Sequence, residues 1–153
     1  MKQIIELKVN GELYEVAVEP HRTLLEVLRE NLGLTGAKEG CDVGDCGSCT
    51  VLINGKPMFS CLILAVDAKG KDILTIEGLA KEGELHPLQK SFVEQGAIQC
   101  GYCTPGMILV SKSLLDKNPK PTEQEVKKAI SGNLCRCTGY TKIVKAILAT
   151  AQA

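Results

Sequence analysis

The chain has 153 residues, which is enough for one ordinary domain or for two small ones. Lysine plus arginine and aspartate plus glutamate number 18 each, so no basic excess points to nucleic acid or to an anionic membrane as a partner. No apolar run approaches the roughly 20 residues of a membrane span, and the N-terminus lacks the pattern of a secretory signal. We therefore expect a cytoplasmic protein whose thiols are reduced.

The first half of the chain carries the patterns of strands and one helix. Two Asn-Gly pairs, at 10–11 and 54–55, are strong signals for hairpin turns. Thr23 and Glu26 have the spacing of a capping box, which predicts a helix that begins there and ends near Gly33. Period-two alternation predicts strands over residues 4–9, 13–18, 50–53, 57–61 and 73–76. One helix across a mixed sheet is an α+β unit.

From about Gly78 onward, helical signals replace the strand pattern. The predicted helices cover residues 86–95, 104–116, 122–130 and 140–151. Prolines stand at the first turns of the first two, and Thr122 with Glu125 forms a second capping-box pattern. Four short helices with short loops predict a small helical bundle. We place the boundary between the domains in residues 77–85, giving a first domain of 1–77 and a second of 78–153.

Residues 40–49 contain three cysteines with the spacing C-x4-C-x2-C, and a fourth cysteine follows at position 61. This is the plant-type spacing for an iron–sulfur cluster held by four thiolates. Each iron of a two-iron cluster takes two thiolates, so the backbone has to turn tightly around a small core. The interspersed glycines permit such turns, and inward N–H groups can donate to sulfide. The predicted ligands are Cys41, Cys46, Cys49 and Cys61.

The second half holds a further set of four cysteines. One pair, C-x2-C, stands at the start of a predicted helix, and the other, C-x-C, lies between the third and fourth helices. Nearby helix N-termini favour thiolates, and Arg136 is placed to offset negative charge. The predicted ligands of a second site are Cys100, Cys103, Cys135 and Cys137. We expect Cys46 and Cys49 to lie in a surface loop and the second set to be buried against a partner.

Two other uses of the eight cysteines were considered. Four disulfides would require an oxidising compartment, which the absence of an export signal disfavours. A structural zinc suits four thiolates, and C-x2-C is the usual zinc spacing, so zinc is the stronger alternative for the second set. C-x-C is unusual for zinc, and C-x4-C-x2-C in the first set matches the two-iron cluster better.

The sequence carries no apparent site for converting a substrate. No glycine-rich dinucleotide motif follows a predicted strand, so we expect neither FAD nor NAD to bind this chain. His21 and His86 are the two histidines, and both are expected to be solvated loop residues and not general bases. Tyr102 and Tyr140 stand beside predicted ligands and are expected to shield a cluster by packing. Electron transfer to or from a partner is the function these features favour.

Three motifs together resemble the small iron–sulfur subunit of the molybdenum hydroxylases, the family of xanthine dehydrogenase, aldehyde oxidoreductase and carbon monoxide dehydrogenase. They are EGCDVGDCGSCTV at 39–51, QCGYCTPG at 99–106 and GNLCRCTGY at 132–140. The motifs occur in the family's order, the match spans nearly the whole chain, and no ligand position departs from the pattern.

This resemblance implies a ferredoxin-like β-grasp domain followed by a four-helix domain, each holding one 2Fe–2S cluster. It implies a large partner subunit with molybdopterin, usually the cytosine dinucleotide in bacteria, and a medium subunit with FAD, arranged as a dimer of heterotrimers. Substrate hydroxylation would leave two electrons on molybdenum. These would pass to the helical-domain cluster, then to the ferredoxin-like cluster, and then to FAD or an external acceptor. Gln99 and Cys137 match the positions that contact the pterin.

Two alternative functions remain open at this point. A free-standing two-cluster ferredoxin would shuttle between enzymes, and a zinc-stabilised interaction module would have no redox role. Soluble shuttle ferredoxins are often strongly acidic, which steers them to their partners. The formal net charge here is zero, which favours a permanent interface.

Overall fold

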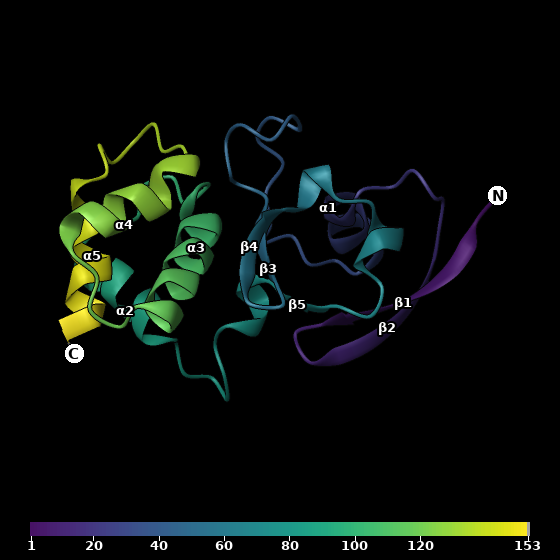
Figure 1. Cartoon of the computed structure of the whole chain (residues 1–153), viewed down its shortest axis with the longest axis horizontal. Helices are drawn as coiled ribbons and strands as arrows, with labels where there is room; N and C mark the ends of the chain where they lie inside the picture. Colours follow the sequence, from purple (N-terminus) through teal and green to yellow (C-terminus); the bar gives the residue numbers. More distant parts are fainter. Residues whose placement is uncertain (153) are drawn as a thin grey trace.

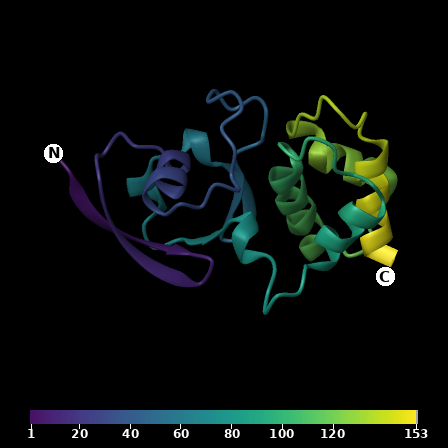
Figure 2. The same ribbon diagram turned by 180° about the vertical axis from the view of Figure 1, so that it is seen from behind.

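A five-stranded mixed sheet forms the N-terminal half of the computed structural model, which describes residues 1–152 (Figure 1). The strand order is β2-β1-β5-β3-β4. The strands are β1 (Gln3–Val9), β2 (Glu12–Val18), β3 (Thr50–Ile53), β4 (Lys56–Phe59) and β5 (Asp72–Leu74). β1 and β5 run parallel, whereas the other pairs are antiparallel. The helical half lies beside the β3–β4 edge, and the chain termini lie at opposite ends of the molecule (Figures 1 and 2).

All five predicted strands are present, but two of them end earlier than predicted. The alternation in β1 buries Ile5, Leu7 and Val9, and both Asn-Gly turns have positive φ, as tight hairpins require. The second hairpin ends at Phe59, so Cys61 lies in a 3-10 turn, Ser60–Leu62, and not in a strand. Where the hairpin ends, the hydroxyl and the backbone N–H of Ser60 both donate to the carbonyl oxygen of Cys49, at 2.7 and 3.4 Å. Likewise β5 ends at Leu74, before a 3-10 turn over Ile76–Gly78.

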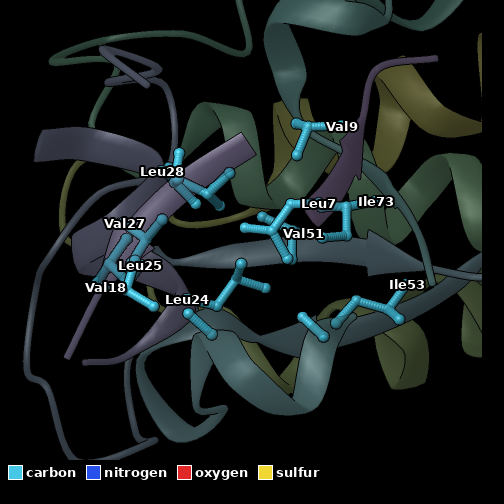
Figure 3. Close-up of a cluster of buried hydrophobic side chains, with 14 of the residues drawn as sticks. Leu7, Val9, Val18, Leu24, Leu25, Val27, Leu28, Val51, Ile53 and Ile73 are labelled. Atoms are coloured by element: carbon cyan, nitrogen blue, oxygen red, sulfur yellow. The ribbon is translucent and has the colours of Figure 1, made fainter. Parts of the chain in front are cut away.

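The predicted helix over the sheet begins as an α-helix and continues as a π-helix. α1 (Leu24–Glu26) begins at the predicted capping box of Thr23 and Glu26, and a π-helical turn, Val27–Asn31, continues it. The turn keeps Val27 and Leu28 buried alongside Leu24 and Leu25. Figure 3 shows these side chains packed with others from the strands, including Leu7, Val18, Val51 and Ile73. This hydrophobic core fixes the surface from which the first cysteine loop departs.

Four further helices form the C-terminal half: α2 (Pro87–Glu94), α3 (Thr104–Lys117), α4 (Glu123–Ala129) and α5 (Thr141–Gln152). A second cluster of buried side chains, which includes Phe92, Met107, Ile143 and Ile147, holds them together. The capping box of Thr122 and Glu125 begins α4 as predicted. A 3-10 turn, Ile130–Gly132, follows α4 and leads into the segment with the last two cysteines. The domain boundary at residue 77 stays a prediction.

His86 lies just ahead of a helix, as predicted, but it is half-buried and not solvated. It is the N-cap of α2: its Nδ1 accepts a hydrogen bond from the backbone N–H of Leu88 at 3.2 Å, while its own N–H donates to the Gln89 side chain. Burial lowers the pKa of His86, so the imidazole is neutral near pH 7 and Nδ1 can accept. A histidine cap was missed because Ser, Thr, Asp and Asn are the usual capping residues.

Helix α3 joins the two halves by packing against β3 and β4. In this contact the hydroxyl of Ser113, which is buried, donates to the carbonyl oxygen of Gly55 in the β3–β4 turn at 2.9 Å. Within residues 1–152, no helix is both long and apolar enough to cross a membrane.

Candidate metal centres

The first cysteine loop wraps its backbone around the sulfur of Cys41. The N–H groups of Val43, Asp45 and Cys46 point at this Sγ, with nitrogen–sulfur distances of 3.5, 3.3 and 3.4 Å. Positive φ angles at Asp42 and Gly44 turn the chain so that successive N–H groups face one side. Such a concave array of N–H groups binds anions, so the loop is suited to a thiolate or to a negatively charged cluster.

The thiols of the first set influence each other in two pairs. The Cys46 thiol contributes to the pKa of Cys41, and the Cys49 thiol contributes to that of Cys61. Hydrogen bonds from the N–H groups of Val43, Cys46 and Asp45 lower the pKa of Cys41 to about 7. Burial, with the neighbouring Cys49 thiol, raises the pKa of Cys61 to about 12. Cys41 is therefore partly ionised at neutral pH, whereas Cys61 is a protonated thiol.

The expectation that Cys49 lies in a surface loop is wrong. Cys46 is half-buried, but Cys49 and Cys61 are 3% and 6% exposed and belong to the hydrophobic core of the N-terminal half. Cys49 immediately precedes β3, whose residues are all buried, so its side chain points beneath the loop. The first site is therefore enclosed on its inner side by this chain alone.

The second set comes together where α3 begins and the segment after α4 returns. The sulfur atoms of Cys100 and Cys137 are 3.5 Å apart, and the Cys135 thiol lies near enough to Cys103 to raise its pKa. Again the sulfur atoms form two pairs. The hydroxyl of Tyr140 accepts a hydrogen bond from the backbone N–H of Cys135 at 2.9 Å, which holds this segment against the start of α5.

Local environment sets the ionisation of these thiols more than the helix dipole does. Cys103 is the N-cap residue of α3, yet burial and the adjacent Cys135 raise its pKa to about 12. Burial also acts to raise the pKa of Cys135, but hydrogen bonds from the hydroxyl and N–H of Thr138 outweigh it and lower that pKa. A hydrogen bond with Cys100 raises the pKa of Cys137.

One side of the second site is open in this chain. Cys100 and Cys137 are exposed, as are Gln99 and Arg136 beside them. Ile98, Tyr102 and Leu134 are large apolar residues in the same segments, and they are 39%, 45% and 56% exposed. The hydroxyl of Tyr102 donates to the carbonyl oxygen of Glu39 and so connects the two halves, while shielding of a cluster by this ring stays a prediction.

The two sites are joined by a direct backbone contact. The N–H of Leu134 donates to the carbonyl oxygen of Cys46 at 2.9 Å, and Leu134 precedes Cys135. Cys46 of the first set is therefore connected to Cys135 of the second set through this hydrogen bond and the backbone of Leu134. Sequence reasoning missed this contact because nothing local signals a pairing of segments so far apart.

The paired sulfur atoms fit two-iron clusters, since each iron of such a cluster takes two thiolates. All eight cysteines are free thiols. Among residues 1–152, no three or more His, Cys, Asp or Glu side chains are gathered around one point as a single metal ion would need. The N–H groups around Cys41 would stabilise the negative charge that a thiolate-bound cluster carries.

Comparison with known proteins agrees with this geometry. A model for a 2Fe-2S iron-sulfur cluster binding domain matches residues 7–74, and a model for a [2Fe-2S] binding domain matches residues 75–148. The nicotinate dehydrogenase small FeS subunit of Eubacterium barkeri is 55% identical over 146 residues, which is 95% of this chain and 93% of that protein.

Two solved structures have the same fold. Quinoline 2-oxidoreductase from Pseudomonas putida 86 matches with a TM-score of 0.96 and 50% identity over 99% of this chain and 95% of its own. The aldehyde oxidoreductase from Desulfovibrio desulfuricans matches with a TM-score of 0.93 and 41% identity over 97% of this chain but only 17% of its own. The chain belongs to the family of small iron–sulfur subunits of the molybdenum hydroxylases.

The pKa values predict an order of thiol reactivity in the iron-free chain. Thiolates and not thiols react with iodoacetamide, so Cys41 should be alkylated before Cys61 and Cys103 near pH 7. The rate at Cys41 should level off above its pKa of about 7, whereas the rates at Cys61 and Cys103 should keep rising up to about 12. Mass spectrometry of timed samples measures each rate. Unfolding the chain should abolish the order, and equal rates for Cys41 and Cys61 in the folded chain would contradict it.

Proposed function

We propose that this chain is the electron-transfer subunit of a molybdenum hydroxylase and holds two 2Fe–2S clusters. The observation that carries the proposal is the arrangement of two four-cysteine sets in contact with each other, one enclosed by the chain and one open at the surface. The family supports the same function. The chain supplies the electron path, and substrate conversion belongs to a partner.

In this proposal each set of four cysteines is one complete ligand set. Cys41, Cys46, Cys49 and Cys61 hold the cluster of a ferredoxin-like β-grasp domain, residues 1–77. Cys100, Cys103, Cys135 and Cys137 hold the cluster of a small four-helix bundle, residues 78–153. When bound, each cluster supplies one-electron redox chemistry. The N–H groups around Cys41 favour the reduced, more negative state of the first site, and Arg136 does so at the second.

The open side of the second site is where we place the large, molybdopterin-binding subunit. Exposed apolar residues flank exposed cysteines there, and thiolate sites open to water on one side gain protection from a covering partner. Gln99 and Cys137, both exposed at this side, are the proposed contacts to the pterin, whose expected form is the cytosine dinucleotide. Electrons then enter through the second site and leave through the first.

A medium subunit with FAD, next to the first site, completes the proposed complex, arranged as a dimer of heterotrimers in the cytoplasm. The aldehyde oxidoreductase from Desulfovibrio desulfuricans, in which the matching part is 17% of a long chain, supports a role within a larger assembly.

Metal analysis tests the two-cluster proposal. We expect about four irons and four acid-labile sulfides per chain, because each 2Fe–2S cluster takes four thiolates. Anaerobic reduction should give two distinct paramagnetic signals. A Cys100→Ser variant should weaken or lose one signal while the other persists. Iron near two per chain together with stoichiometric zinc would contradict the proposal and favour the zinc alternative for the second set.

Replacement of Gln99 tests the contact to the pterin. A Gln99→Ala variant keeps all eight thiols, so its iron content should match that of the wild-type complex. A glutamine amide can both donate and accept, which suits a pterin edge, and loss of a buried hydrogen bond costs roughly 1–3 kcal/mol. The molybdenum content should therefore fall, or substrate should reduce the cluster at the second site more slowly in a stopped-flow measurement. Gln95→Ala, an exposed glutamine beyond α2, is the matched control. Unchanged values in Gln99→Ala would remove this residue from the pterin site.

A further inference from the structure

Asn133 reaches from one cysteine segment into the other. It lies two residues before Cys135, and it is only 3% exposed. Its Nδ2 donates to the carbonyl oxygen of Gly47 at 2.9 Å and to the hydroxyl of Thr50 at 3.3 Å. Gly47 and Thr50 flank the loop positions of Cys46 and Cys49. A buried amide with both contacts made is a rigid connection, because water does not compete for the donors.

The backbones at this contact approach so closely that no side chain fits between them. A Cβ on Gly47 would lie 2.5 Å from the carbonyl oxygen of Gly132, and a Cβ on Gly106 would lie 2.6 Å from the carbonyl oxygen of Gly47. Gly47 also has φ of +71°, which favours glycine. Three segments therefore meet in backbone contact: the cysteine loop, the first turn of α3 and the end of the Ile130–Gly132 turn.

The same contact sets the register between the cysteine segments. With Asn133 fixed on Gly47, the N–H of the next residue, Leu134, meets the carbonyl oxygen of Cys46 at 2.9 Å. The hydrogen bond from Ser113 to Gly55 lies at the β3–β4 turn, away from the cysteines, whereas the one from Tyr102 to the carbonyl oxygen of Glu39 also lies near both sets. Tyr102 is 45% exposed, so Asn133 is the buried side-chain anchor between the two ligand sets.

We propose that Asn133 is a positioning residue for electron transfer between the two clusters: it holds the segment of Cys135 against the loop of Cys46 and so sets their separation. The inference rests on the proposed two-cluster function. Electron transfer and magnetic coupling between two centres both weaken steeply with distance. A small opening at this contact should therefore change the coupling without changing either ligand set.

Two variants open the contact by different means. Asn133→Leu keeps a branched side chain of similar size but removes the donor to Gly47. Gly106→Ala keeps Asn133 and places a methyl group against the carbonyl oxygen of Gly47. Alanine is a better helix former than glycine, so helix propensity alone would not harm α3.

Two matched controls leave the contact intact. Ser113→Ala removes a buried hydrogen bond between the halves that is remote from the cysteines. Gly132→Ala keeps the carbonyl oxygen that lies against Gly47, and within residues 1–152 the added methyl group would meet only Phe59, at an ordinary contact distance of 3.8 Å.

The measurement is the magnetic interaction between the two reduced clusters, by electron paramagnetic resonance of the assembled, fully reduced complex. We expect Asn133→Leu and Gly106→Ala to retain iron and both signals but to lose much of the splitting or relaxation enhancement between them. Both controls should match the wild-type complex. A role in general stability alone would not move this signature while iron content stays constant.

Several results would overturn the inference. They are wild-type interaction in both fully loaded variants, an equal loss in Ser113→Ala, or two clusters without any interaction in the wild-type complex. Loss of iron from both variants, with both controls loaded, would also overturn it, because the contact would then be a folding requirement. A wild-type complex with fewer than two clusters in this chain would instead contradict the proposed function itself.

Discussion

Four thiolates have to converge on one small inorganic core, and in our proposal this chain meets that demand twice with different backbone devices. In the first site, a loop with left-handed residues encircles the sulfur of Cys41 and directs three N–H groups at it. In the second, the start of α3 and an irregular segment held by Tyr140 bring two sulfur pairs together. The sheet and the helices serve to hold these segments in place.

The two sites differ in how completely this chain encloses them. Core packing buries Cys49 and Cys61, so the N-terminal half provides its own inner wall. Cys100 and Cys137 have no such cover, and exposed apolar side chains lie in the segments around them. This asymmetry gives the proposed electron path a direction, from a partner at the open site toward the enclosed one.

Local signals in the sequence were sufficient for much of the fold. The alternation over β1, the two Asn-Gly turns and the capping boxes at Thr23 and Thr122 depend on neighbours within a few residues, and each is present in the structure. The assignment of the eight cysteines to two ligand sets stays a prediction. The structure departs from prediction at the end of the second hairpin, where a 3-10 turn, Ser60–Leu62, contains Cys61.

The contacts between the sites had no local signal at all. Asn133 and Gly47 are 86 residues apart, and neither the asparagine nor the glycine differs in sequence from ordinary turn residues. The same holds for Tyr102, whose bond to the carbonyl oxygen of Glu39 spans 63 residues. Side-chain donors to a distant backbone carbonyl depend on how two segments pack, which propensity and periodicity do not specify.

The most direct test of the claim that a partner completes the second site is the rate at which a chelator removes iron from each cluster. Paramagnetic resonance can follow the two clusters separately in the isolated chain and in the assembled complex. The account predicts that assembly slows iron loss strongly at the site of Cys100 and Cys137 and only slightly at the site of Cys49 and Cys61. Equal lability of the second site in the free and assembled forms would contradict it.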